Sequence, residues 1–285
     1  MKYNNLNDDV IVNEKDNNFL KFLYNNILGR TILKVITKPI ISEKISILLN
    51  KKISILLAKK YIKKYNINLS DCEKEKFYSF NDFFTRKYKT IGRSSKETDF
   101  ISTAESKITY YQISKELIIN IKNSKYTIDE LIKDIKLARE YEEGICLVYR
   151  LTPNDYHRYI FVDNGIQKKI KRIQGILHTV SPISYERYKV FSENTREVSL
   201  LRTENFDDII QIEVGALCVG KIQNNNNYEM KKYKEKGYFE FGGSTIIQLI
   251  KKDILQVNDK IIKNSEEDIE TKVKVGEIIA IKKHK

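Results

Sequence analysis

The chain has 285 residues, and its apolar share of 41%, with 18 Tyr and 12 Phe, can fill a sizeable core and excludes disorder over most of the length. Its 51 basic and 38 acidic residues leave a net charge of +13, which favours an anionic partner such as nucleic acid or an acidic lipid surface. A composition rich in Lys and Asn is also typical of an AT-rich genome, so charge alone does not identify that partner. The three cysteines form no close pair, which excludes a disulfide framework and indicates a reducing compartment.

The N-terminal stretch is polar and lacks the basic-then-apolar order of a signal peptide. No apolar run approaches the roughly 20 residues of a membrane-spanning helix. We therefore expect a protein that is soluble or peripheral to a membrane.

Residues 19–65 show apolar side chains at helical spacing among many lysines. Pro39 is expected to separate two helices. An amphipathic, strongly basic stretch of this kind suits a contact in the plane of a membrane, and we assign residues 1–78 to such a region. Ordinary helices that pack on their own domain with lysines facing outward would give the same pattern.

Two shorter segments follow. Residues 79–89 carry aromatic and basic side chains, which fit either a helix capped by Asn81 or Asp82 or a platform for stacking nucleic-acid bases. Residues 123–143 predict a solvent-facing helix, with Thr127 and Glu130 forming a capping box.

Beyond Gly144 the chain is rich in β-branched and aromatic residues, which predicts strands within 145–151, 209–222, 237–250 and 272–281. The fold class is therefore α+β, with a helical N-terminal third packed on a β-rich C-terminal body. We place this body at residues 79–285.

Few residues offer metal or nucleotide chemistry. Of the three histidines, His284 lies in a basic tail, and no Cys or His pair has the spacing of zinc ligands. No glycine-rich phosphate loop is present either. We expect no metal, and His157 and His178 remain as candidates for proton transfer.

The segments at 151–159, 175–182, 192–197, 214–222 and 236–249 are chemically dense, and in this order they resemble the phosphatidylserine decarboxylase family. The matching motif residues are Asp155, Tyr156, His157 and Arg158; Glu193, Asn194 and Arg196; Val214, Gly215, Ala216, Val219 and Gly220; and Gly242, Gly243, Ser244 and Thr245. The resemblance runs from about Ser79 to Ile281. Each motif alone also has a structural interpretation, such as a glycine turn between strands or a buried histidine.

The resemblance implies a proenzyme that cuts itself. Ser244 would attack the carbonyl of Gly243, leaving residues 1–243 as a β chain, 244–285 as an α chain and a pyruvoyl cofactor derived from Ser244. This group would form a Schiff base with phosphatidylserine and act as the electron sink for CO₂ loss, producing phosphatidylethanolamine.

The resemblance further implies that His157 returns a proton to the substrate and that Arg158 and Tyr156 bind it. Asp155 and Arg158 could instead form an ion pair, and His178 is expected at the end of a strand. The implied protein is a β/α heterodimer, with further oligomerisation left open, bound peripherally to anionic lipid at the cytoplasmic face of the cell membrane.

Two positions depart from the family pattern for self-cleavage. The family's Ser-Pro-x-Asp-Gly stretch reads Ser102 to Ser106 here, with Glu105 at the position of the Asp, and Ile160 replaces the relay His. Glu keeps a carboxylate, whereas Ile removes the base, for which His178 or a water held by Glu105 could substitute. An uncleaved member that binds phospholipid without turnover is therefore an alternative. A nucleic-acid-binding protein is disfavoured, because the densest basic segments are amphipathic helices.

Overall fold

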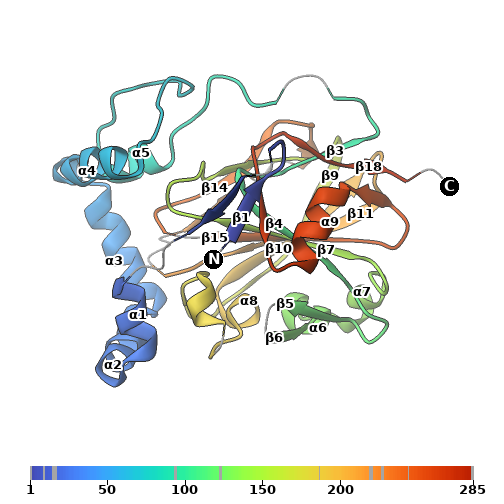
Figure 1. Ribbon diagram of the computed structural model, residues 1–285, viewed down its shortest axis with the longest axis horizontal. Coiled ribbons are helices and arrows are strands. Elements are labelled where there is room, and N and C mark those ends of the chain that lie inside the picture. Colours follow the sequence, from blue (N-terminus) through green and yellow to red (C-terminus); the bar gives the residue numbers. More distant parts are fainter. Residues whose placement is uncertain are drawn as a thin grey trace.

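The computed structural model describes residues 2–8, 10–14, 18–92, 95–121, 124–185, 187–217, 221–225, 228–242 and 244–283, except for the side chains of 169–170. The first helices gather along one side of a β-rich body (Figure 1). They are α1 (Asn18–Asn25), α2 (Ile27–Ile36), α3 (Pro39–Leu49), the 3₁₀ turn η1 (Lys52–Ser54), α4 (Ile55–Tyr65) and α5 (Phe80–Phe84). Later helices are α6 (Ile128–Ile132), α7 (Ile135–Arg139), η2 (Pro182–Ser184), α8 (Val190–Glu193) and α9 (Asp259–Glu266).

The body is built on a ten-stranded sheet with the order β13-β9-β10-β11-β15-β7-β4-β17-β1-β2. Its strands are β1 (Lys2–Asn5), β2 (Ile11–Asn13), β4 (Ser106–Gln112), β7 (Ile145–Leu151), β9 (Gly165–Ile173), β10 (Arg196–Thr203), β11 (Asp208–Val214), β13 (Glu229–Met230), β15 (Ser244–Ile250) and β17 (Glu270–Val273). Neighbours pair antiparallel except β1 and β17, which are parallel. β15 therefore runs through the middle of the sheet, between β11 and β7.

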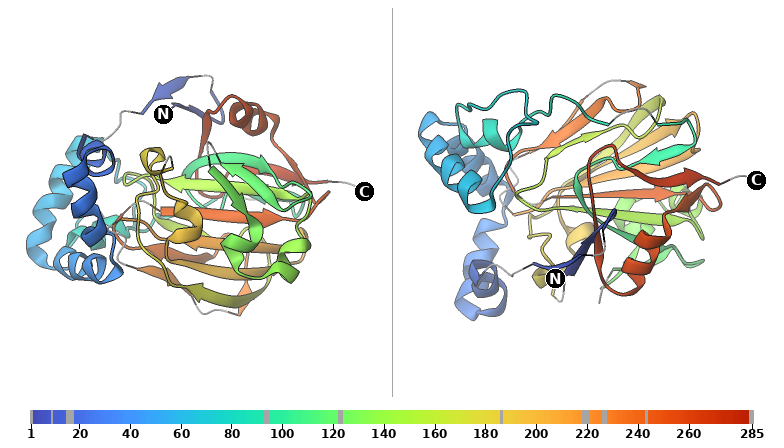
Figure 2. Two further views of the ribbon diagram at one scale, coloured as in Figure 1. Left: turned by 90° about the horizontal axis from the view of Figure 1, so that it is seen from below. Right: turned by 45° about the horizontal axis from the view of Figure 1, so that its top comes forward.

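Smaller sheets complete the fold. They are β12 (Ile222–Asn224), β14 (Glu235–Phe239) and β8 (Arg158–Ile160); β16 (Leu255–Val257), β18 (Ile278–Lys282) and β3 (Asp99–Ile101); and β5 (Ile118–Ile121) with β6 (Ser124–Thr127). One hydrophobic core joins the large sheet to both three-stranded sheets. A second core lies between the large sheet and α6, α8, β5 and β6. Figure 2 shows α1 to α4 at one flank of these layers, where α1 and α2 pack against Ile183, Tyr188 and Leu217.

The α+β class is confirmed by these elements, and Pro39 does begin a new helix. The prediction of one solvent-facing helix over 123–143 is wrong, because β6 and two short helices occupy this stretch. The first of them, α6, ends where Lys133 adopts a left-handed conformation (φ 54°). The capping box of Thr127 and Glu130 is confirmed. The cap of α5 is Ser79, whose hydroxyl accepts the Asp82 amide at 3.1 Å, and not Asn81 or Asp82.

The N-terminal hairpin of β1 and β2 was not predicted. It extends the edge of the sheet at β17, more than 250 residues further along the chain, so local sequence carries little of this information. No helix within the described ranges is long and apolar enough to cross a membrane.

Candidate active site

Ser244 is the first residue of the central strand β15. It pairs with Leu151 of β7, while the following Thr245 pairs with Val214 of β11. Ser244 and Thr245 are fully buried, and neither hydroxyl has a hydrogen-bond partner among the described residues. A buried polar group without a partner costs about 1–3 kcal/mol, which marks this position as a candidate functional site.

The turn before Ser244 is constrained on its N-terminal side. Gly242 has φ 138°, a conformation that residues with a side chain rarely adopt. The Phe241 amide donates to Asn81 Oδ1 at 3.3 Å, and the Phe241 ring packs on Phe84 with centroids 5.3 Å apart. Gly243, the other predicted cleavage residue, lies outside the described residues. Contacts with α5 therefore fix the position of Phe241, three residues before Ser244.

His157 lies against the same aromatic cluster. Its ring centroid is 3.9 Å from that of Phe84, and its carbonyl accepts the Phe239 amide at 3.0 Å. Nδ1 is 2.9 Å from the Asp155 carbonyl oxygen, which can only accept, so Nδ1 carries the proton and Nε2 is the basic nitrogen. Nε2 has no partner among the described residues. Burial lowers the pKa of His157 to about 3, so the imidazole is neutral at pH 7.

Asp155 fixes the turn that leads from β7 to His157. Its Oδ2 accepts the Thr152 amide at 2.7 Å and the Thr152 hydroxyl at 2.6 Å, and it forms a buried ion pair with Lys107 at 3.3 Å. Burial alone would raise the pKa of Asp155, but Lys107 and these hydrogen bonds hold it below its usual value. Asp155 is therefore an ionised carboxylate beside a neutral imidazole.

The pKa of Glu105 is shifted in the direction opposite to that of Asp155. It lies just before β4, and its Oε2 accepts the Tyr88 hydroxyl at 3.0 Å. Burial, followed by repulsion from the nearby Asp155 carboxylate, raises the pKa of Glu105. The Tyr88 ring stacks on Tyr156 at 4.0 Å, and the Tyr156 hydroxyl accepts the Tyr88 amide at 3.4 Å. Glu105 therefore lies near Asp155, and Tyr88 links Glu105 to Tyr156.

Arg158 is held by protein groups. Its guanidinium meets both carboxylate oxygens of Glu235 at 2.9 Å, donates to the Thr85 carbonyl at 2.8 Å and lies 4.6 Å from the Tyr238 ring centroid. Asp155 is paired with Lys107, so the alternative ion pair between Asp155 and Arg158 does not form. Binding of substrate by Arg158 stays a prediction.

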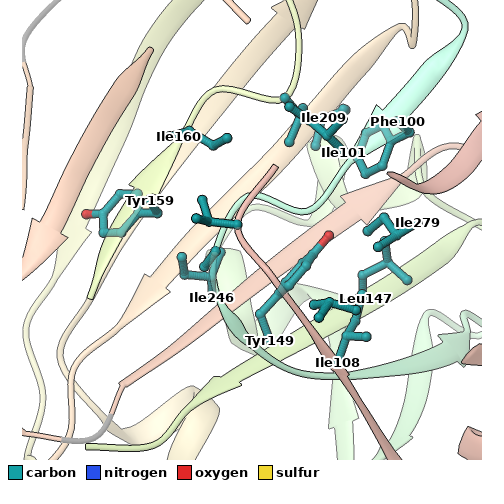
Figure 3. Close-up of a cluster of buried hydrophobic side chains, with 14 of the residues drawn as sticks. Phe100, Ile101, Ile108, Leu147, Tyr149, Tyr159, Ile160, Ile209, Ile246 and Ile279 are labelled. Carbon is teal, nitrogen blue, oxygen red and sulfur yellow. The ribbon is translucent and has the colours of Figure 1, made fainter. Parts of the chain in front are cut away.

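Ile160 lies in the core that joins the large sheet to the smaller ones. Its backbone amide donates to Thr103, and its carbonyl accepts the Thr103 hydroxyl at 2.7 Å. Figure 3 shows its side chain among the apolar residues of this core, which include Ile209 and Ile246. Position 160 therefore offers no side-chain proton acceptor.

His178 belongs to another part of the molecule. It lies in a loop rather than at the end of a strand, and its Nδ1 is 3.1 Å from the hydroxyl of Tyr24 in α1. Its ring stacks on Tyr188 at 3.8 Å. Burial lowers the pKa of His178 to about 4. The described contacts of this histidine join α1 to the body and involve neither Ser244 nor Glu105.

Lys107, Tyr88 and Phe84 were missed in the sequence. Glu105 and Lys107 are two residues apart around the start of β4, and this spacing could have placed both on one face of the strand. Lys107 is 48 residues from its partner Asp155, so no local pattern shows the pairing. Within the described part of the chain, no group of three His, Cys, Asp or Glu side chains could hold a metal ion.

The site thus combines a buried serine at the start of β15 with a neutral imidazole that packs against the same α5 ring, Phe84, as Phe241 does. A family model described as phosphatidylserine decarboxylase matches residues 80–281. The phosphatidylserine decarboxylase proenzyme 2 of Clostridium acetobutylicum is 52% identical over 266 residues, 92% of this chain and 91% of the relative.

Two further relatives come from Clostridium botulinum. The phosphatidylserine decarboxylase proenzyme of strain Hall is 38% identical over 99% of both chains. That of strain Eklund 17B is 41% identical over 93% of this chain and 92% of the relative. The chain belongs to the phosphatidylserine decarboxylase family, which confirms the resemblance noted in the motifs and assigns it to a family of carboxy-lyases.

Proposed function

We propose that this protein decarboxylates phosphatidylserine to phosphatidylethanolamine after a self-cleavage between residues 243 and 244. The observation that carries the proposal is the buried Ser244 hydroxyl, which has no partner among the described residues and lies two residues after Gly242, whose φ of 138° favours glycine. A pyruvoyl group formed from Ser244 would supply the carbonyl that binds the substrate amine and the electron sink for the bonding pair that remains when CO₂ leaves. The remaining chemistry falls to the side chains around it.

His157 is the proton carrier that this arrangement favours. Among the described residues, its neutral Nε2 is an acceptor without a donor, and the Ser244 hydroxyl is a donor without an acceptor. Strand pairing of Ser244 with Leu151 and the contact of Phe241 with Phe84 bring both chain segments to the same aromatic cluster. We infer that Nε2 takes the hydroxyl proton during self-cleavage and later returns a proton to the substrate carbon. Since the Ile160 side chain cannot accept a proton, we assign this proton transfer to His157.

Cleavage would leave the two products interlocked. Residues 244–285 contain β15 and β17, which lie inside the large sheet between strands of the longer fragment. The hydrogen-bonded pairing of β15 with β7 and β11 supports a tight heterodimer of residues 1–243 and 244–285.

We further propose that α1 to α4 bind an anionic membrane peripherally, at the cytoplasmic face. These helices and the short turns between them expose large apolar side chains on a lysine-rich surface: Phe19, Ile27, Leu28, Ile32, Val35, Ile40, Ile47, Leu48, Ile53, Leu56 and Leu57. Burial of such a face in the lipid interface, with about 1 kcal/mol for each lysine near the surface, suffices for reversible binding.

Flotation of the full-length chain with phosphatidylglycerol liposomes tests this membrane contact. Ile53 and Leu57 are 75% and 52% exposed, and the double substitution Ile53→Glu with Leu57→Glu should abolish flotation. Ile135→Glu is a matched control, because Ile135 is 49% exposed but lies on α7 in the body. The Ile135→Glu chain should float as the parent chain does. Equal flotation of the double variant and the parent would refute the contact.

The second candidate function is phospholipid binding without turnover. It is favoured by Ile160 in the core and by Glu105, whose carboxylate is engaged by Tyr88 rather than by an imidazole. Incubation of the purified chain with phosphatidylserine separates the two functions. Formation of phosphatidylethanolamine supports the decarboxylase, whereas binding with no product over days supports the alternative.

A further inference from the structure

Lys107 is a nearly fully buried cation on β4 that the proposed reaction does not use. Its Nζ donates to the Thr152 hydroxyl at 2.9 Å and to Asp155 Oδ2 at 3.3 Å. The side chain is 4% exposed, and a buried charge of this kind is costly unless it is paired. These contacts anchor the ammonium at the first and last residues of one turn.

That turn positions the candidate imidazole. Asp155 Oδ2 accepts both the amide and the hydroxyl of Thr152, and the Asp155 amide donates to the Thr152 carbonyl at 2.9 Å. The Asp155 carbonyl then holds Nδ1 of His157 at 2.9 Å. A shift of the Asp155 carboxylate would therefore move the carbonyl that fixes the tautomer of His157.

The N-terminal hairpin covers Lys107 from outside. Tyr3 of β1 is paired with Glu270 of β17, and its ring centroid lies 5.2 Å from Lys107 Nζ, within the range of a cation–π contact. Glu14, just after β2, forms an ion pair with Arg150 of β7 at 2.7 Å. Figure 1 shows this hairpin against the body, away from α1 to α4.

We propose that Lys107 is a positioning residue for His157, acting through Asp155, and that Tyr3 of the N-terminal hairpin keeps its ammonium in place. The catalytic meaning of this role rests on the proposed function, but the state of the imidazole can be measured without any turnover. Lys107 also lowers the pKa of His157, because its positive charge disfavours the imidazolium.

The Asp155 carboxylate interacts with titratable groups from several elements: Lys107, Glu105, His157 and Tyr61. Lys272 of β17 acts on Glu105, and Arg86 acts on His157. Among the described residues, Lys107 is the cation that contacts the Asp155 carboxylate, whereas Arg86 donates to the Asp155 backbone carbonyl at 3.1 Å. Without the Lys107 charge, the repulsion between Asp155 and Glu105 would be less well compensated, so the pKa of Asp155 would rise. The turn from Thr152 to Asp155 would then loosen.

Nuclear magnetic resonance of labelled histidines in the full-length Ser244→Ala chain tests the proposal, since only three imidazoles have to be assigned. In this parent, His157 should stay neutral with its proton on Nδ1 between pH 7 and pH 5. Lys107→Met should give a mixture of tautomers and raise the titration midpoint of His157 by at least one pH unit. Lys107→Arg should restore most of the parent behaviour.

Lys236→Met is the matched control. Lys236 is another fully buried lysine, paired with Glu213 at 2.8 Å, and its described bonds do not touch residues 152–157. It should lower the melting temperature but leave His157 unchanged. An unchanged tautomer and midpoint in folded Lys107→Met would overturn the proposal, as would an equal change in Lys236→Met.

Tyr3→Leu provides the second variant if Lys107→Met does not fold. It should shift the His157 midpoint in the same direction by a few tenths of a pH unit, whereas Tyr228→Leu on the exposed surface should not. In that case an unshifted midpoint in Tyr3→Leu would overturn the proposal. Failure of the wild-type chain to form phosphatidylethanolamine would contradict the proposed function and leave these measurements standing.

Discussion

Two motif regions of this molecule treat their polar groups in opposite ways. Around Ser244 and His157, a buried hydroxyl and a buried ring nitrogen have no partner among the described residues. The side chains of Asn194 and Arg196, in contrast, are hydrogen-bonded to the backbone. Asn194 bonds His178 and Gly215, and Arg196 donates to four backbone carbonyls. Both regions carry family motifs, so hydrogen-bond satisfaction separates the candidate reacting groups from the framework.

The largest effect is expected at Ser244. Ser244→Ala should remain a single chain and lose all decarboxylation, because no group at position 244 can then attack residue 243. Intact mass and phosphatidylethanolamine formation measure both. Ser42→Ala is a matched control, since the buried Ser42 hydroxyl on α3 also has no partner among the described residues. A cleaved and active Ser244→Ala chain would break the comparison at its centre.

His157 should give the next largest effect. His157→Ala should reduce both the rate of self-cleavage and kcat by about 10²–10⁴-fold, the usual contribution of a positioned proton carrier. His178→Gln should keep both rates within a few-fold, because the described contacts of the His178 side chain are to α1 and Tyr188. Similar losses in the two variants would show that the unpartnered nitrogen of His157 has no special role.

Asn194 tests the other side of the comparison. Asn194→Ala leaves backbone groups of His178 and Gly215 without their partner, so the free energy of unfolding should fall by about 3 kcal/mol. Urea unfolding of the uncleaved Ser244→Ala chain measures this loss. Decarboxylation per cleaved molecule should change little at a temperature where the cleaved Asn194→Ala chain is folded. A large loss of kcat with normal stability would assign Asn194 to the reaction instead.

A smaller effect concerns pH. The folded-state pKa values of His157 and His178 are lowered by burial to about 3 and about 4, so the unfolded chain binds protons first as pH falls. Their stabilising contribution is complete above about pH 6.5 and is lost toward pH 4, with a cost of about 2 kcal/mol for each imidazole at pH 5. Urea unfolding at pH 7 and pH 5 checks this. His178→Gln should remove about half of the difference; an unchanged difference would show that His178 does not titrate in this way.

The sequence allowed prediction of features that depend on local pattern. β7 spans the predicted 145–151, since a run that is apolar apart from Arg150 fills a strand buried on both faces. The family motifs marked Ser244 and His157 as candidates. The sequence also showed that position 160 carries no imidazole, but it did not show that Ile160 lies in the core with Ile209.

The remaining features depend on contacts between distant residues. The hairpin of β1 and β2 needs the edge of β17, and Lys107 needs Asp155. The tautomer of His157 depends on the Asp155 carbonyl, a backbone atom that every residue carries. The commitment of Arg158 to Glu235 likewise requires β8 and β14 to be paired.

The intact mass of the purified wild-type chain, followed over time on a denaturing gel, tests the central claim most directly. The account predicts two fragments, residues 1–243 and residues 244–285, the latter with a pyruvoyl group at its N-terminus. It also predicts that Ile160→His with Glu105→Asp will not be needed for cleavage, because His157 supplies the base. A wild-type chain that keeps its full mass for days, while the double variant cleaves, would contradict the assignment of this step to Ser244 and His157.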